Sequence, residues 1–143
     1  MSVEQVARDF VTNMNDAEKL KAHISVGAVA SGGVLPQPIP MLEALNIIGG
    51  LMAGIPDMKY DIQKVTVNGN QATVNVKWGG TQTGPLSMPG MATVPATGKK
   101  VSVKDTYIIT VQGDKISHFN VDSPADGGIP GALAQLGVKM PAM

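Results

Sequence analysis

The chain contains no cysteine, so no disulfide can stabilise its fold and no thiol can act as a nucleophile. Arginine occurs once, as Arg8, and the 11 basic side chains are balanced by 11 acidic ones. Binding to nucleic-acid phosphates needs a surplus of Lys and Arg, so we expect no nucleic-acid partner. Aromatic residues make up only 3% of the chain and charged residues only 15%. The core is therefore expected to consist of Val, Ile, Leu, Ala and Met.

The common signatures of metal and nucleophilic sites are also missing. The only histidines, His23 and His118, lie on different predicted elements without a His-x-x-x-His or cysteine pattern, so we expect no metal. The sequence has no Gly-x-Ser-x-Gly motif and no glycine-rich loop that opens a helix toward a phosphate. Among catalytic chemistries this leaves proton transfer by carboxyl groups, which needs no cofactor.

No long apolar run is available for a membrane-spanning helix. The longest nearly uncharged stretch, residues 26–42, is interrupted by Gly32-Gly33 and by three prolines. Residues 1–14 carry charges within their apolar pattern and so lack the uninterrupted stretch of a signal peptide. We expect no membrane partner and a cytoplasmic location. A length of 143 residues suits one domain, residues 1–143.

Three helices are expected in the first part of the chain. Residues 3–14 carry apolar side chains at the spacings of one helical stripe, and Ser2 stands at the position of an N-terminal cap. Asp16 can cap a second, shorter helix over residues 17–23. A third helix should follow Pro40, because the first helical turn tolerates proline.

After Asp57 the hydrophobic period changes from about 3.6 to 2, which indicates strands. Asn68-Gly69 and Gly113-Asp114 are signals for hairpin turns, and a slip in the alternation near Lys64 predicts a β-bulge. Helices followed by an antiparallel meander are the α+β pattern. The expected strands cover residues 24–30, 58–67, 72–78, 101–111 and 115–122, and a last short helix covers residues 131–138.

Several short motifs occur in the order and at the spacing of a known family. They are Ile55-Pro56-Asp57, the Asn68-Gly69 turn, Trp78-Gly79-Gly80-Thr81-Gln82-Thr83-Gly84, Pro95-Ala96-Thr97-Gly98-Lys99 and Asp114-Lys115-Ile116. With these motifs the chain resembles the SnoaL-like polyketide cyclases, which belong to the nuclear-transport-factor-2-like, or ketosteroid-isomerase-like, superfamily. The resemblance covers residues 3–122, which is most of the chain.

The resemblance implies a fold and a site. It implies three N-terminal helices packed on a curved antiparallel sheet, with a cone-shaped pocket between them, and usually a homodimer. SnoaL-like cyclases use an Asp on the last strand as acid/base, helped by His and Gln on the strand before. Asp122 lies where that Asp is expected, whereas residues 101–111 contain neither His nor Gln. The dimer interface is expected on the face that carries Ile108, Phe119 and Val121, which offers apolar area among Thr and Ser.

The segment 84–98 is rich in Pro, Gly and Met, so we expect a loop rather than a regular element. Its apolar side chains would contribute no free energy of burial in a solvated loop. They would either close over the pocket as a mobile flap or pack on the partner subunit: Leu86, Met88, Met91 and Val94.

The last hairpin determines which polar side chains meet. A two-residue loop at Gly113-Asp114 pairs Gln112 with Lys115 and, counted outward, places Asp105 opposite Asp122. Two carboxylates with Cβ atoms about 5 Å apart cannot both ionise comfortably, so the pKa of one should rise. One face of this hairpin then carries five polar side chains, namely Asp105, Tyr107, His118, Asn120 and Asp122.

A three-residue loop gives a different register. It would pair Lys104 with Asp122 and bring Tyr107 against Phe119, because a slip of one residue changes faces. We prefer the two-residue loop, since a Gly-Asp pair is typical of it.

Two hypotheses about function follow. In the first, the protein is a cofactor-free acid/base catalyst of the cyclase or isomerase type that acts on a small, apolar molecule with a carbonyl group. Asp122 would remove a proton alpha to the carbonyl, while Asp105, Tyr107 or His118 donates to the enolate, and Asn120 and Trp78 contact the substrate. In the second, the protein binds an apolar ligand or dimerises without turnover. Asp122 would then end its strand as a turn residue, and Trp78 would belong to the core.

Overall fold

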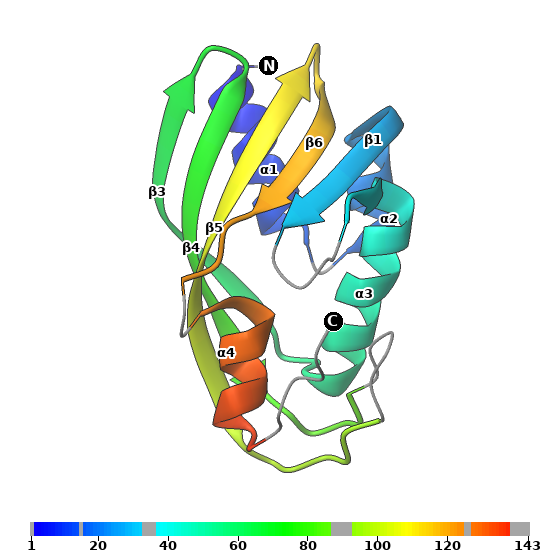
Figure 1. The fold of residues 1–143 in the computed structure, drawn as a ribbon, viewed down its shortest axis with the longest axis vertical. Helices are drawn as coiled ribbons and strands as arrows, with labels where there is room; N and C mark the ends of the chain where they lie inside the picture. Colours follow the sequence, from blue (N-terminus) through cyan, green and yellow to red (C-terminus); the bar gives the residue numbers. More distant parts are fainter. Residues whose placement is uncertain (1, 15, 33–36, 87–92, 125–126, 138–143) are drawn as a thin grey trace.

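The computed structural model describes residues 2–14, 16–32, 37–86, 93–124 and 127–137 (Figure 1). Along these ranges the helices and strands follow one another as α1 (Val3–Thr12), α2 (Ala17–Ala22), β1 (Ile24–Gly32), β2 (Ile39–Pro40), α3 (Met41–Gly54), β3 (Lys59–Asn68), β4 (Gln71–Thr81), β5 (Lys100–Gln112), β6 (Lys115–Val121) and α4 (Gly128–Gln135). No helix in these ranges is both long and apolar enough to cross a bilayer.

The strands form one sheet in the order β2-β1-β6-β5-β4-β3. This arrangement confirms the α+β class, but the expectation of a wholly antiparallel sheet is wrong, because β1 runs parallel to β6. The long connection through α3 and the meander of β3, β4 and β5 permits parallel pairing, which a short turn would not. The helical layer also differs from the expectation. Three helices precede β3, and α4 follows the sheet as a fourth, beginning at Gly128 rather than at residue 131.

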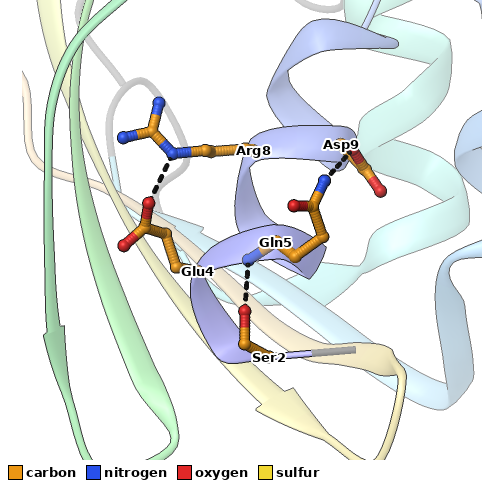
Figure 2. A network of polar contacts seen from close by, with 5 residues as sticks. All are labelled: Ser2, Glu4, Gln5, Arg8 and Asp9. Atoms are coloured by element: carbon orange, nitrogen blue, oxygen red, sulfur yellow. Dashed lines mark hydrogen bonds and ion pairs between the residues drawn. The ribbon is translucent and has the colours of Figure 1, made fainter.

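Helix α1 lies across one face of the sheet, which we call the inner face (Figure 1). Its opposite side is polar, as Figure 2 shows: Arg8 Nε lies 2.8 Å from Glu4 Oε2. Beside this pair, Gln5 Nε2 donates to Asp9 Oδ1. At the start of the helix, Ser2 Oγ accepts from the N–H of Gln5, so the predicted cap is confirmed. The side chains that α1 buries against the sheet are Val6, Ala7, Phe10 and Val11.

The hairpin of β5 and β6 begins as predicted and then slips by one residue. Gln112 pairs with Lys115, which confirms the two-residue turn. Ser117 is then an extra residue in β6, so that Thr110 pairs with His118. A bulge of this kind inverts the faces of everything that follows it in the strand. A second bulge, between Ile62 and Lys64 of β3, lies where the sequence predicted one.

The slip brings Phe119 into the core. Its ring centroid lies 4.9 Å from that of Tyr107 and 5.4 Å from that of Phe10. The predicted pairing of Asp105 with Asp122 is therefore wrong, and so is the alternative pairing of Lys104 with Asp122. The N–H of Asp122 instead donates to the carbonyl of Thr106.

The inner position of Phe119 also changes the expected dimer interface. Phe119 is only 4% exposed, so it adds no apolar area to the outer face on which Ile108 lies. The predicted apolar face of Ile108, Phe119 and Val121 is therefore wrong, because the bulge at Ser117 turns Phe119 and Val121 to the inner face and leaves Ile108 on the outer one.

Gln82 organises the segment that follows β4. It is fully buried, and its Oε1 accepts from both the N–H and the hydroxyl of Thr97. Its Nε2 donates to carbonyls of the same segment, including that of Pro95. Leu86 and Val94 pair across this segment and are buried in the core. The predicted flap residues Met88 and Met91 lie outside the described residues.

Helix α4 covers an edge that β6 leaves open. Because β6 ends at Val121, opposite Tyr107, the first half of β5 has no strand on that side. The side-chain amide of Gln135 takes the place of a strand there. Its Oε1 accepts from the N–H of Ser102, and its Nε2 donates to the carbonyl of Ser102, both at 2.8 Å. Leu133 and other apolar residues of α4 are buried beneath this contact.

Replacing Gln135 by Ala should loosen α4 from β5. The change removes two hydrogen bonds, so we expect the free energy of unfolding to fall by about 1–3 kcal/mol and the amide of Ser102 to exchange faster. Urea unfolding and hydrogen exchange measure these effects. Gln112→Ala, at the exposed end of the same strand, is the matched control. Unchanged stability together with unchanged protection of Ser102 would contradict the role of Gln135.

Candidate functional site

A carboxyl group lies on the inner face of the sheet, where apolar side chains are expected. Along β5 every second residue is buried, and Asp105 occupies one of these positions between Val103 and Tyr107. Only 5% of Asp105 is exposed. Neither a lysine nor the arginine forms an ion pair with it in the described part of the chain. The burial of this residue therefore needs hydrogen bonds as compensation.

Three donors supply that compensation. Trp78 Nε1 of β4 donates to Asp105 Oδ2 at 3.2 Å. Ser123 Oγ donates to Asp105 Oδ1 at 2.8 Å, and the backbone N–H of Thr106 donates to the same oxygen at 3.1 Å. Both carboxyl oxygens are thus held, one from the neighbouring strand and the other from the segment after β6.

Burial raises the pKa of Asp105 above its ordinary value. The hydrogen bonds from Ser123 and Trp78 act in the opposite direction, because they favour the ionised form, but they do not cancel the effect of burial. The negative charge of Asp122 adds a further small rise. The expected rise of one carboxyl pKa is thus present, although burial rather than Asp122 is its main cause.

Two phenols accompany the carboxyl group. Burial raises the pKa of Tyr107 on β5 and of Tyr60 on β3, and the charge of Asp105 raises both further. The ring of Tyr60 lies next to Trp78, with 6.2 Å between the centroids. Both tyrosines therefore keep their protons at neutral pH and can donate hydrogen bonds. The result is a small polar cluster, which we call the Asp105 cluster: Tyr60, Trp78, Asp105, Tyr107 and Ser123.

A cleft of about 430 Å³ reaches this cluster from the outer face of the sheet. Asn75 and Thr106, which line it, alternate with buried residues along their strands and so belong to the outer face. Asp105 and Ser123 also line the cleft. The carboxyl group is thus buried on the inner side and close to a polar opening on the other.

The structure divides the predicted site residues into groups. Asp105, Tyr107 and Trp78 come together on the inner face. Asp122 follows the end of β6, is exposed, and lines the outer cleft. His118 and Asn120 lie on the outer face, because the bulge in β6 turns them away from Tyr107.

On the outer face, His118 and Asn120 share a partner in β1. Ser31 Oγ lies 2.6 Å from His118 Nε2 and donates to Asn120 Oδ1 at 2.8 Å. These three side chains join β1 to β6, where the two strands run parallel. No hydrogen bond within the described ranges links them to the Asp105 cluster, so the structure separates His118 and Asn120 from Asp105, while Asp122 lines the same outer cleft as Asp105.

Sequence reasoning missed two members of the Asp105 cluster. Tyr60 could have been found, because it alternates in phase with Met58 and Ile62 and therefore faces inward with Trp78. Ser123 lies beyond the last strand, where no periodicity indicates a direction. In the described ranges, no three His, Asp or Glu side chains gather where they could hold a metal ion.

Comparisons with known proteins agree with this fold. The sequence profile of the family described as SnoaL-like polyketide cyclase matches residues 43–119, which is more than half of the chain. The search of curated protein sequences gives no match.

Solved structures resemble the chain over nearly its whole length. AclR from Streptomyces galilaeus, described as a candidate hydroxylase, has a TM-score of 0.77 and 16% identity over 97% of both chains. IdmH from Streptomyces antibioticus, described as a candidate polyketide cyclase, has a TM-score of 0.74 and 21% identity over 96% of this chain and 100% of its own. A protein from Catenulispora acidiphila with a ketosteroid-isomerase-like fold, crystallised with trimethylamine, has a TM-score of 0.71 and 13% identity over 98% of this chain and 100% of its own. At these identities the likeness concerns the fold alone.

The pKa of Asp105 should make stability depend on pH. Because its pKa is higher in the folded state than in the unfolded chain, where it is about 3.9, the folded state binds more protons between the two values. The free energy of unfolding therefore falls as pH rises through this window. Asp105→Asn removes the effect, so the stability of the variant minus that of the wild type should rise with pH and then level off.

Urea unfolding of both proteins between about pH 3.5 and 8 measures this difference. In the difference between the two proteins, the contributions of carboxyl groups remote from Asp105 to the pH dependence of stability cancel. Asp57 is one of these groups, and its pKa is lowered chiefly by the N–H of Thr81. A stability difference that is independent of pH, or that falls as pH rises, would contradict the raised pKa of Asp105.

Proposed function

The chain belongs to the SnoaL-like polyketide cyclase family, and we propose that it is a cofactor-free acid/base catalyst of the cyclase or isomerase type. Its substrate would be a small, largely apolar molecule with a carbonyl group. The observation that carries this proposal is the carboxyl group of Asp105, which is buried on the apolar inner face without a cation and has a raised pKa. A carboxyl group of this kind can exchange protons with a weak carbon acid near neutral pH.

The proposed chemistry uses the members of the Asp105 cluster in different roles. In its ionised form Asp105 removes a proton alpha to the carbonyl and later returns it to the enolate or to a second atom. The phenols of Tyr60 and Tyr107 stay protonated and donate to the oxygen on which negative charge develops. Trp78 Nε1 and Ser123 Oγ hold the two carboxyl oxygens in place.

We place the base at Asp105 rather than at Asp122. Asp122 is exposed, so an apolar substrate that reached it would stay surrounded by water, and the charge of its enolate would gain little from fixed dipoles. Asp105 is only 5% exposed and lies among buried residues on the inner face, where fixed dipoles can stabilise such a charge. His118, with its partners Ser31 and Asn120, would join two strands rather than act on substrate.

Several expectations from the sequence remain part of the proposal. We expect a pocket between the inner face of the sheet and the helices to hold the substrate, a homodimer as the working form, and a cytoplasmic location.

A second candidate function is binding of a small apolar ligand without turnover. It is favoured by residues 101–111 of β5, which carry neither the His nor the Gln expected in a SnoaL-like cyclase. In that case the Asp105 cluster would hold a ligand oxygen by hydrogen bonds and would transfer no proton.

Exchange of alpha protons tests the catalytic proposal directly. Small apolar ketones, including cyclohex-3-enone, are incubated with the protein in D₂O, and NMR follows deuterium uptake and migration of the double bond. We expect Asp105→Asn to reduce the rate by about 100-fold or more, as loss of a positioned base does. Asp61→Asn, an exposed carboxyl on β3, is the matched control and should leave the rate unchanged.

Two further outcomes separate the hypotheses. If Asp122→Asn abolishes exchange while Asp105→Asn does not, the assignment from the sequence is correct and the one from burial is wrong. If 2-naphthol binds in a manner that depends on Asp105 but no ketone exchanges, the protein is a binding module.

A further inference from the structure

The sheet is interrupted beside Asp105. Strand β6 ends at Val121, opposite Tyr107, while β5 extends back to Lys100, so no strand pairs with residues 100–106 of β5 on that side. The segment after β6 passes this opening, where the N–H of Asp122 donates to the carbonyl of Thr106. Ser123 is the next residue, and it reaches Asp105 around the edge of the sheet.

The outer cleft meets the carboxyl group at this opening. Gln63, Asn75, Lys104 and Asp122 give it a polar lining, so it is suited to hold water. Ser123 also lines the cleft and is half-buried, with its hydroxyl 2.8 Å from Asp105 Oδ1. Oδ2 of Asp105 is occupied differently, by Trp78 Nε1 on the inner face.

The start of α4 closes the other side of Ser123. The backbone of Gly128 lies so close to Ser123 Oγ that a Cβ at position 128 would collide with it. Gly128 has a φ of +60°, which a residue with a side chain rarely adopts. Ser123 is thus held between Gly128 and Asp105, and the cleft is the polar opening that the structure gives it.

We propose that the hydroxyl of Ser123 relays protons between water in the outer cleft and the carboxyl group of Asp105. The inference rests on the proposed role of Asp105 as acid/base. When ionised Asp105 takes up a proton, Ser123 Oγ receives a proton from a hydronium ion or a buffer acid in the cleft as its own proton passes to Asp105 Oδ1, and the donor is left as water or as the conjugate base. The reverse step returns the proton to the cleft, and the hydroxyl is neutral before and after. Substrate would approach from the inner face, so proton supply and substrate use opposite sides of the sheet.

The charges near the relay come from several elements. Tyr60 of β3 and Tyr107 of β5 lie on the inner side and stay neutral. Lys104 and Asp122 line the cleft. This places one cation and one anion on the solvent side of Ser123.

Trp78 makes the relay measurable without any substrate. It is the only tryptophan of the chain and donates to Asp105, so its emission should respond when the carboxyl group gains or loses a proton. A pH titration of Trp78 emission gives the equilibrium midpoint, and the transition should be absent in Asp105→Asn. A laser-induced pH jump then gives the relaxation rate. The relaxation rate is measured at several proton concentrations, and its slope against proton concentration gives the rate constant for protonation of Asp105. This rate constant is obtained separately from the equilibrium pKa.

We expect Ser123→Ala to lower the protonation rate constant by about 100-fold, because a positioned proton carrier is lost. Ser123→Thr keeps a hydroxyl and should restore a rate near that of the wild type, which a packing role alone would not predict. Ser117→Ala is the matched control, since Ser117 is also a half-buried serine after β5 but donates to Thr110.

The outcomes are distinguishable. If Ser123→Ala relaxes at the wild-type rate, or if Ser123→Thr is as slow as Ser123→Ala, the relay is wrong while the role of Asp105 is unaffected. If Trp78 emission shows no transition that depends on Asp105, the premise about Asp105 fails and the relay fails with it.

Discussion

The hydrogen bond from the indole of Trp78 to the carboxyl group of Asp105 joins two central strands on the inner face of the sheet. An unpartnered carboxyl group at this depth would cost several kcal/mol, so its donors are a condition of the fold as well as of any chemistry. Trp78 comes from β4, Thr106 from β5 and Ser123 from the segment after β6. Besides β5 itself, two other parts of the chain, β4 and the segment after β6, therefore supply donors to the buried Asp105.

The hydrogen bond from Ser123 to Asp105 makes the segment after β6 part of the candidate site. Because β6 is shorter than β5, the chain after Val121 can turn over the open edge of β5 and deliver Ser123 to Asp105. Helix α4 then covers the remaining edge, where Gln135 bonds the backbone of Ser102 in place of a strand (Figure 1). A polar cleft lies beside Asp105 on the outer side of the sheet. A carboxyl group that is desolvated toward the core and near water on the other side is suited to repeated proton exchange.

The sequence predicted the elements better than it predicted the site. Amphipathic stripes, caps and two-residue turns act locally, so α1, the bulge of β3 and the turn at Gly113-Asp114 were correct. The bulge at Ser117 depends on packing: Phe119 is buried against Phe10 from α1, and this contact inverts the face of β6. One signal was available, since Ile116 and Phe119 are large apolar residues at a spacing that regular alternation does not allow. Ser123 carried no such signal, because its contact with Asp105 arises where β6 ends.

The central claim is that Asp105 has a raised pKa because it is buried on the inner face. The most direct test is a pH titration of the side-chain carboxyl ¹³C resonance of Asp105 by NMR, with the resonance identified by its loss in Asp105→Asn. The account predicts a midpoint above the ordinary value of about 3.9 for Asp. A midpoint at or below that value would show that the carboxyl group is ionised like an exposed one, and it would contradict the assignment of Asp105 as the acid/base.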